Sequence, residues 1–391
     1  MELSAEIEFL IKSSSISETN NWEKEILDII PKIKYWDWIF ECASRNSIAP
    51  LMFYNLQKSG TITNCPIEFS EKLNITYKTE VLRKLKIRGV FLEISQKLYL
   101  NNIMIMPLKG IILQHEIYIE PSLRPMIDID ILIREIDTEK AINLLLDMGC
   151  KETVYSESRF IDSLKHHYPP LFYKGISVEL HRSLVDDYDP VQINLSNFWE
   201  TSVLSEIEGI KVFKPENCHL LIYLCHHVYS SQKGGSVKLI WYCDIYFYLL
   251  KYSSSLNWDY FMQLVSEYNA EKTVYYSLGT VKFIFEYTGL PEMVYSKINE
   301  YCKKPSIIYK YLENENINFT NEHYFQKFLH IDGSVNKLKY LSNRLFPSYS
   351  FIKNKYKTNS QLKIFSGYFI EFSSFIFQGI KAMYLYFTRR D

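Results

Sequence analysis

Several features that would assign the chain to a class at once are missing from its sequence. Acidic and basic residues nearly cancel, with 45 Asp and Glu against 44 Lys and Arg, so no global electrostatic field favours nucleic acid as a partner. The seven cysteines show no paired spacing and leave one over, which is typical of reduced thiols in a cytoplasm. The first residues are acidic and lack the basic and apolar regions of a signal peptide. We therefore expect a cytoplasmic protein without a nucleic acid partner.

A long uninterrupted apolar run is also missing. The longest apolar stretch near the end of the chain, about 365–387, is interrupted by charged residues such as Glu371 and Lys381. A transmembrane helix needs about 20 mostly apolar residues with few charges. We therefore expect no transmembrane segment and predict a packed amphipathic helix here. Peripheral membrane contact through Lys381, Arg389 and Arg390 is the alternative.

Glycine and proline are scarce, with 13 of each in 391 residues, which favours long helices over many hairpins. This length favours two or three modules. The spacing of apolar residues predicts an N-terminal helical region at 1–100, an α/β core at 101–200 and a C-terminal helical region at 201–391. The polar stretch at 313–322 indicates a linker or an exposed loop.

Short strands and helices alternate within the predicted core. An α+β fold with a mixed sheet is therefore expected, in which Lys174 and Gly175 form a hairpin turn between two strands. Strands are predicted at 103–106, 127–133, 153–155, 170–173 and 176–181, with helices at 110–118 and 137–146.

Two acidic residues lie within one of these strands. Asp128 and Asp130 alternate with isoleucine, so both carboxylates point to the same face of the sheet. Adjacent like charges are costly unless they are paired or bound to a cation, and Mg²⁺ prefers carboxylate oxygens. Glu179 alternates with apolar residues on a later strand and is the best candidate for a third carboxylate. The alternatives are an ion pair of the aspartates with Arg124 and, for Glu179, an ion pair with Arg182 or Lys174.

Lys109 and Gly110 precede the acidic strand and open a predicted helix. The backbone N–H groups at a helix start bind phosphates well. Phosphoryl and nucleotidyl transfer commonly use two metal ions held by about three carboxylates. Together these residues indicate a metal-dependent enzyme that acts on a nucleoside triphosphate.

Further polar residues are candidates for a substrate pocket. His181 follows Glu179 on the same strand face, where it could orient a substrate or Glu179, or simply cap the core. Asp244 lies in an aromatic helix and needs a partner, for which Lys238 or a helix-cap amide is the expected choice. The remaining candidates, which lie in a loop and in a helix expected to cover the cleft, are His166, His167, His226 and His227.

The order of these motifs resembles a large bacterial family of nucleotidyltransferases related to DNA polymerase β. The resemblance begins with Leu-Lys-Gly, a following Arg, Asp-Ile-Asp-Ile-Leu-Ile and Val-Glu-Leu-His. It continues with Leu-Cys-His-His at 224–227, Leu-Ile-Trp-Tyr-Cys-Asp-Ile at 239–245 and Leu-Phe-Pro-Ser at 345–348. It covers most of the chain and is strongest over 100–250.

The resemblance implies a polymerase-β-like fold, two Mg²⁺ ions and a nucleoside triphosphate as donor. It makes Asp128 and Asp130 metal ligands and Glu179 the third carboxylate. Lys109 and Gly110 stand where the wider superfamily carries a Gly-Ser phosphate loop, and here Ile111 replaces the serine. Arg124 would lie near the phosphates or brace the acidic pair.

The expected activity is Mg²⁺-dependent transfer of a nucleoside monophosphate to a hydroxyl or phosphate of an acceptor. The acceptor would be a small molecule, a sugar or a natural product, bound in a pocket shaped by the C-terminal helical region. The alternatives are a nucleotidyltransferase that modifies proteins, a toxin–antitoxin component and a non-catalytic nucleotide-binding protein. The sequence leaves the oligomeric state open.

Overall fold

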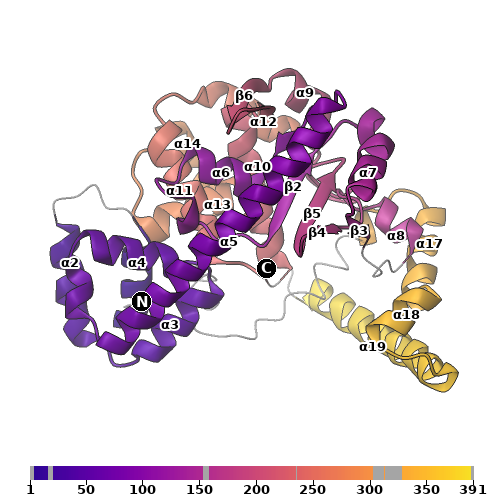
Figure 1. Cartoon of the computed structure of the whole chain (residues 1–391), viewed down its shortest axis with the longest axis horizontal. Helices are drawn as coiled ribbons and strands as arrows, with labels where there is room; N and C mark the ends of the chain where they lie inside the picture. Colours follow the sequence, from indigo (N-terminus) through magenta and orange to yellow (C-terminus); the bar gives the residue numbers. More distant parts are fainter. Residues whose placement is uncertain are drawn as a thin grey trace.

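The computed structural model describes residues 4–15, 21–152, 158–234, 236–302, 312 and 328–388. The structure contains a five-stranded mixed sheet (Figure 1), and helical regions come before and after it in the chain. The predicted α+β fold class is therefore confirmed. Three features of the sequence analysis lie outside the described residues. They are the expected strand at 153–155, the polar stretch at 313–322, and Arg389 with Arg390.

The N-terminal part of the chain is entirely helical up to the sheet. The long helix α5 runs from the other N-terminal helices across to the sheet (Figure 1). Its buried residues Ile87, Val90, Ile94 and Leu98 recur every three or four positions, which places them on one face. The helices are α1 (Ala5–Ser14), α2 (Trp22–Ile29), α3 (Trp36–Arg45), α4 (Ala49–Lys58) and α5 (Ile67–Leu100).

The sheet has the strand order β1-β2-β5-β4-β3. Strands β2 and β5 are parallel, and the other neighbours are antiparallel. Lys174 and Gly175 join β4 to β5 with φ of 51° and 78°, which is the backbone of a two-residue hairpin turn, so the predicted hairpin is confirmed. The strands are β1 (Met106–Pro107), β2 (Asp128–Leu132), β3 (Lys151–Glu152), β4 (Leu171–Tyr173) and β5 (Ile176–His181).

Near this sheet, one predicted strand differs from the structure and one hairpin was not predicted. The strand expected at 103–106 is reduced to β1, because the carbonyl of Ile105 accepts a hydrogen bond from the N–H of Phe213 at 2.8 Å rather than joining β2. Phe213 belongs to a hairpin that the sequence analysis did not predict. This hairpin consists of β6 (Val203–Ile207) and β7 (Ile210–Lys214).

The remaining helices surround the sheet and form the C-terminal part. The predicted helices at 110–118 and 137–146 are α6 (Lys109–Glu116) and α7 (Thr138–Asp147). None of the helices in the described part of the chain is long and apolar enough to cross a membrane. The others are α8 (Arg159–Ser163), α9 (Leu195–Glu200), α10 (Asn217–Lys233), α11 (Leu239–Tyr252), α12 (Trp258–Glu267), α13 (Glu271–Phe285), α14 (Glu292–Tyr301), α17 (Ser334–Leu345), α18 (Tyr349–Lys355) and α19 (Gln361–Thr388).

The buried residues fall into two clusters. One continuous hydrophobic core runs from Ile7 to Leu312 and joins the N-terminal helices, the sheet and helices α10–α14. A much smaller cluster contains Ile161, Ile331 and Tyr340 and connects α8 with α17. Among the described residues, this small cluster is the buried contact that joins α17 to the preceding part of the chain.

Candidate active site

Two of the predicted carboxylates lie side by side in the sheet. In the parallel pairing of β2 with β5, Asp130 is directly opposite Glu179. Ile129 and Ile131 on the same strand are fully buried in the core. Because neighbouring side chains of a strand point to opposite faces, this burial turns Asp128 and Asp130 to the other face of the sheet. The core therefore fixes the direction in which the acids point.

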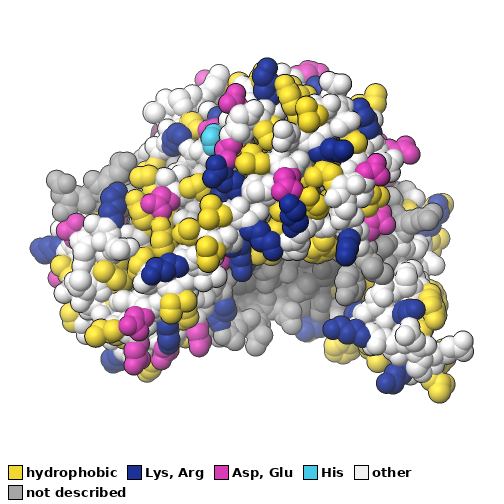
Figure 2. Space-filling view, in the orientation of Figure 1, with side chains coloured by type: hydrophobic (Ala, Val, Ile, Leu, Met, Phe, Trp, Pro, Cys, Tyr) yellow, Lys and Arg dark blue, Asp and Glu magenta, His cyan; other side chains and the backbone are white. Residues whose placement is uncertain are grey.

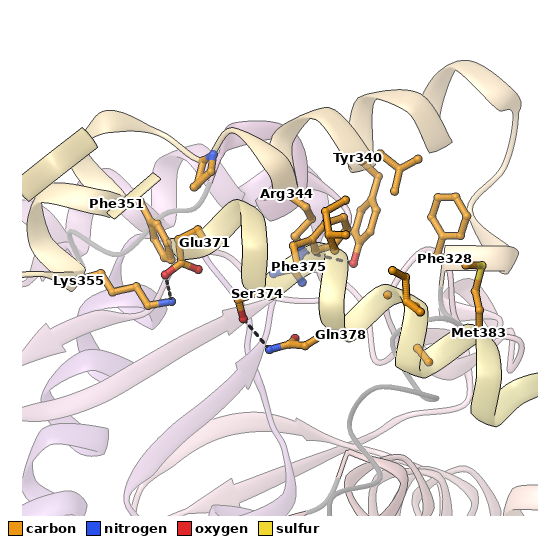
Figure 3. Close-up of a pocket in the computed structure, with 16 residues that line it drawn as sticks. Phe328, Tyr340, Arg344, Phe351, Lys355, Glu371, Ser374, Phe375, Gln378 and Met383 are labelled. Atoms are coloured by element: carbon orange, nitrogen blue, oxygen red, sulfur yellow. Dashed lines mark hydrogen bonds and ion pairs between the residues drawn. The ribbon is translucent and has the colours of Figure 1, made fainter. Parts of the chain in front are cut away.

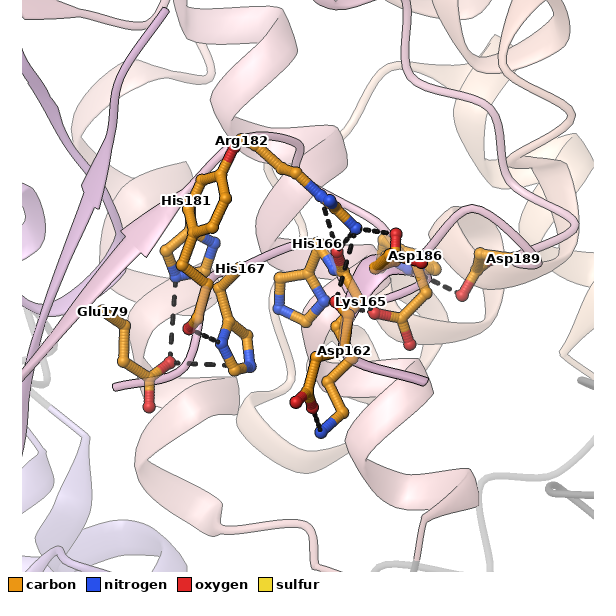
Figure 4. Close-up of polar contacts among 12 residues, drawn as sticks. Asp162, Lys165, His166, His167, Glu179, His181, Arg182, Asp186 and Asp189 are labelled. Atoms are coloured by element: carbon orange, nitrogen blue, oxygen red, sulfur yellow. Dashed lines mark hydrogen bonds and ion pairs between the residues drawn. The ribbon is translucent and has the colours of Figure 1, made fainter. Parts of the chain in front are cut away.

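His181 stands next to these acids and is fully buried. Its Nε2 lies 2.8 Å from Oδ1 of Asp130 and 3.9 Å from Oε2 of Glu179; Figure 4 shows Glu179, His181 and His167 facing one another. Burial lowers the pKa of His181 to about 4, so the ring is neutral at neutral pH. An ionised carboxylate only accepts hydrogen bonds, so Nε2 carries the ring proton and donates a hydrogen bond to Asp130. The sequence analysis left the role of His181 open, and the structure places its ring against Asp130 rather than at the cavity.

The three acids influence one another's pKa values. Burial, and then the charge of Asp130, raise the pKa values of Asp128 and Glu179. Burial would also raise the pKa of Asp130, but Lys109 and the hydrogen bond from His181 hold it well below its usual range. Nζ of Lys109 lies 3.6 Å from Oδ2 of Asp130. One lysine thus compensates a cluster of three acids, and a further cation would be stabilised there.

The donor groups fit a divalent cation. One oxygen of Asp130, one oxygen of Glu179 and one nitrogen of His181 lie within 4.8 Å of one another. Since Nε2 of His181 is engaged as a hydrogen-bond donor to Asp130, the carboxylate oxygens are the groups of this cluster that could bind a cation. The alternative ion pairs expected for Glu179 are not formed: Lys174 pairs with Glu93 at 2.6 Å, and Arg182 donates to the carbonyl of Lys165 at 2.9 Å.

The turn before α6 lies against the acidic strand. The N–H of Leu108 donates to the carbonyl of Asp130 at 3.0 Å, and Lys109 has a left-handed φ of 39°. Leu108 offers no side-chain cap to α6, so the first N–H groups of the helix are open to another acceptor. A Cβ on Gly110 would lie 2.9 Å from Nη1 of Arg124 and 3.1 Å from Sδ of Met126. Glycine is therefore required where this turn meets Arg124.

Arg124 forms a buried ion pair with a partner that the sequence analysis did not name. Its Nε and Nη2 donate to the carboxylate of Asp244 at 3.1 and 2.8 Å, and the hydroxyl of Tyr118 donates to the same carboxylate at 2.7 Å. Asp244 is 2% exposed. The expectation that Lys238 or a cap amide would be the partner of Asp244 is therefore wrong, because α11 places Asp244 against the loop that carries Arg124. This pair joins the turn before β2 to the C-terminal helices.

A cavity of about 550 Å³ opens beside the acidic strand. It brings together predicted residues from α6, β2, α10 and α11 with residues of the N-terminal helices that the sequence analysis missed. The missed residues on α5 could not be predicted, because they are a few among many polar residues on this helix and nothing in the local sequence distinguishes them. The predicted residues in its wall are Lys109, Gly110, Arg124, Asp128, Asp130, His227 and Lys238, and the polar residues that were missed are Ser44, Ser47, Thr76, Glu80 and Arg83.

A family model described as an uncharacterised nucleotidyltransferase matches residues 34–286. The chain belongs to this nucleotidyltransferase family. The resemblance noted from the motifs is thus confirmed, and the matched residues include the acidic strands, the turn before α6 and the helices that line the cavity. No curated protein matches the chain significantly.

The other predicted residues lie around the nucleotidyltransferase cavity or just beyond it. The ring of His227 meets Trp241 edge to face at 4.8 Å, and burial holds its pKa well below the usual value. Nζ of Lys238 lies 3.4 Å from Oγ of Ser47, which ties α11 to the N-terminal helices. Nε2 of His167 lies 4.0 Å from Oε2 of Glu179.

Two further predicted histidines contact acidic side chains. Nδ1 of His166 lies 2.6 Å from Oδ1 of Asp186, and Nε2 of His226 lies 3.5 Å from Oδ2 of Asp189. Figure 4 shows His166 and Asp186 together, next to Arg182. His166 lies in the loop after α8, whereas His226 lies in α10. Neither histidine is among the residues that line the cavity.

Proposed function

We propose that the protein transfers a nucleoside monophosphate from a nucleoside triphosphate to a hydroxyl or phosphate of an acceptor, with Mg²⁺ as cofactor. The observation that carries this proposal is the placement of Asp130 opposite Glu179 on parallel strands, with Asp128 on the same face. The open first turn of α6 lies beside them, and Asp128 and Asp130 face the cavity of about 550 Å³. Family membership supports the reaction class.

The metal would be held by Asp128, Asp130 and Glu179. Bound divalent ions would neutralise the triphosphate and stabilise the attacking and leaving oxygens of an in-line displacement. His181 holds Asp130 in a fixed rotamer by its 2.8 Å hydrogen bond. Lys109, at 3.6 Å from Asp130, keeps that carboxylate ionised. The protein thus maintains one permanently charged ligand in a buried position.

The triphosphate would lie between α6 and α11. Its oxygens would accept hydrogen bonds from the first N–H groups of α6 at Gly110, which no side chain caps. Lys109 at the start of α6, Lys238 before α11 and Arg83 on α5 all line the cavity and would supply positive charge. Arg124 is committed to Asp244, so its contribution would be to fix the turn.

The acceptor would enter from the side of His227 and Trp241. A cavity of about 550 Å³ lies within the range of small-molecule sites, about 300–1,000 Å³, and this size favours a small acceptor over a folded protein. Acceptance of the proton of the attacking hydroxyl is the alternative role of Glu179 to metal binding, and burial and Asp130 raise the pKa of this carboxyl group. His181 is a poorer proton acceptor, because it is fully buried and its pKa is lowered to about 4.

Incubation with each of the four NTPs, labelled at the α-phosphate, tests the proposal. We expect Mg²⁺-dependent release of pyrophosphate and transfer of label to a small molecule from a cell extract. Label in a protein band would instead indicate protein modification. In the variant Asp130→Asn the rate should fall by about 100-fold or more, because loss of a metal ligand removes several kcal/mol of transition-state stabilisation.

The matched control is Glu152→Gln, an exposed acid on β3, compared with Glu179→Gln. Only the second should lose activity, and binding of Mn²⁺ followed by electron paramagnetic resonance should weaken in the same variant. Full activity of Asp130→Asn or of Glu179→Gln would refute the assignment. If the protein binds NTPs but converts none of the four, the non-catalytic alternative would be supported.

A further inference from the structure

The C-terminal helix α19 carries an apolar face that no other part of the described chain covers. At 100° per residue these side chains fall on one side of the helix, and no charged residue lies among them. Leu362, Phe365, Phe369 and Phe377 are 81%, 75%, 69% and 70% exposed. The complete face consists of Leu362, Phe365, Phe369, Ile370, Phe372, Ile376, Phe377, Ile380, Met383 and Tyr384.

The opposite face of α19 is the one that holds the helix to the protein. Ile364 and Ala382 are buried, and α19 packs against α17 and α18. A Cβ on Gly367 would lie 2.8 Å from Cγ2 of Ile352, which shows how closely α18 approaches. The sequence analysis predicted a packed amphipathic helix, and the structure packs α19 through Ile364, Gly367 and Ala382 while its large apolar side chains are turned outwards. Figure 1 shows α17, α18 and α19 together at one end of the molecule.

This end of the chain is strongly basic. Over 333–388 the only acidic residue is Glu371, although the whole chain has a net charge of −1. Lys363 and Lys381 lie at one border of the apolar face by helical spacing, and both are exposed. The view in Figure 2 shows dark blue and yellow side chains on this end of the molecule. The eight basic residues are Lys337, Lys339, Arg344, Lys353, Lys355, Lys357, Lys363 and Lys381.

We propose that α19 docks onto an anionic phospholipid membrane and lies in the plane of its interface. Phenylalanine, isoleucine and tyrosine would enter the acyl boundary, while the lysines of α18 and α19 would meet the headgroups. A second copy of the chain fits less well, because two such basic ends would repel each other. With 28 residues the helix extends about 42 Å, and its serines and lysines suit the interface rather than the bilayer core.

An apolar cavity continues this face into the protein. It has a volume of about 530 Å³ and lies between α17, α18 and α19. Ile376, Ile380 and Met383 line it and also belong to the exposed face. Figure 3 shows Met383 and Phe328 at one end of the cavity and the ion pair of Lys355 with Glu371 at the other. The cavity is thus mainly apolar, and the polar groups at one end include Lys355, which is paired with Glu371.

Cosedimentation of the full chain with vesicles tests this proposal. One set of vesicles contains phosphatidylcholine alone, and the other adds phosphatidylglycerol. We expect binding to the anionic vesicles that weakens with salt, and little binding to the neutral ones. The triple variant Phe365→Ser, Phe369→Ser, Phe377→Ser should bind at least about tenfold more weakly. Because all three side chains are exposed, the variant should fold normally.

The matched control replaces two exposed phenylalanines outside this end, in the variant Phe172→Ser, Phe283→Ser (41% and 52% exposed), and should bind like the unaltered chain. A second variant, Lys353→Glu, Lys363→Glu, Lys381→Glu, should lose the preference for anionic vesicles. Undiminished vesicle binding by the triple serine variant would overturn the proposal. So would a dimer in lipid-free solution that the serine variant turns into a monomer, because the face would then belong to a second copy. Nucleotidyl transfer in solution should be the same in all these variants.

Discussion

The part of the molecule before residue 302 and the helices after residue 328 use apolar residues in opposite ways. In the first part, side chains from the N-terminal helices, the sheet and α10–α14 share one continuous core. In the second, a cluster of three buried residues provides the attachment, and α19 exposes its apolar face. The family match at 34–286 lies entirely within the first part. The comparison shows that one part holds its acids in a fixed geometry through a continuous core, whereas the other leaves a large apolar face exposed.

The two parts also differ in how they use charge. The Arg124–Asp244 pair is buried, with side chains 7% and 2% exposed, while the Lys355–Glu371 pair on α18 and α19 is 46% and 19% exposed. Breaking a buried pair leaves an uncompensated charge in a poorly solvated place. Breaking an exposed pair leaves each group in water. The predictions below begin with this contrast.

The largest effect is expected from Asp244→Asn. It should lower the free energy of unfolding by about 3–5 kcal/mol, because the guanidinium of Arg124 would be left buried without its counter-charge. Urea unfolding followed by circular dichroism measures the change. The matched variant Lys355→Gln should cost less than about 1 kcal/mol.

The double variant Arg124→Met, Asp244→Leu serves as the control for this prediction. It removes both charges and should recover a large part of the lost stability, because no buried charge remains. If Asp244→Asn unfolds at the urea concentration of the unaltered chain, the pair is not structurally important. Asp244 would then be available for the substrate role considered in the sequence analysis.

The next effect concerns His219, which lies in the continuous core. Burial lowers the pKa of His219 from 6.5 to about 4, and its ring nitrogens contact the hydroxyls of Tyr260 and Tyr268 at 3.2 and 3.0 Å. Between these pH values the unfolded chain binds a proton that the folded chain does not. Its contribution to stability is therefore complete above pH 6.5 and is lost as the pH falls towards 4, by about 3 kcal/mol in all.

The variant His219→Gln tests this by comparison with the unaltered chain. The difference in unfolding free energy between the two proteins should change by that amount between pH 6.5 and pH 4. The control His330→Gln, at an exposed position near α17, should leave the pH dependence unaltered. Parallel pH profiles for the unaltered chain and His219→Gln would contradict the prediction.

The smallest effect is expected from Tyr340→Ala in the small cluster. It should destabilise only α17–α19, by about 1–2 kcal/mol, because few buried contacts join these helices to the rest. Hydrogen exchange should become faster in 334–388 with little change in β2 and β5. In contrast, Phe261→Ala in the continuous core should lower global stability by about 3–5 kcal/mol. Uniformly faster exchange in Tyr340→Ala would show that the two parts unfold as one unit.

Local patterns predicted most of the secondary structure. The helices expected at 110–118 and 137–146 correspond closely to α6 and α7, because their apolar residues recur at helical spacing. The β6–β7 hairpin was missed although Glu208 and Gly209 adopt left-handed φ values of 52° and 84°. A Glu-Gly pair is a weaker turn signal than Asn-Gly or Asp-Gly. The three domain boundaries stay a prediction.

The candidate site was predicted only in part, for a physical reason. The alternation of Asp128 and Asp130 with isoleucine determined that both acids share a face, since a strand has a period of two residues. The position of Glu179 opposite Asp130 depends on the register of β2 with β5. The sequence predicted Glu179 as the best candidate for a third carboxylate on a later strand, but it could not predict the register, because register depends on contacts between distant residues.

The sequence by itself thus determined which faces of the strands and helices are apolar and where the acids lie along the chain. Only the tertiary structure decided that Arg124 pairs with Asp244, that Arg83 and Ser47 line the cavity, and that the apolar face of α19 points outwards. Side-chain periodicity is a property of neighbouring residues and can be predicted from the sequence. The partners of a face are chosen by packing between segments far apart in the chain, where many arrangements compete and the total buried surface selects one.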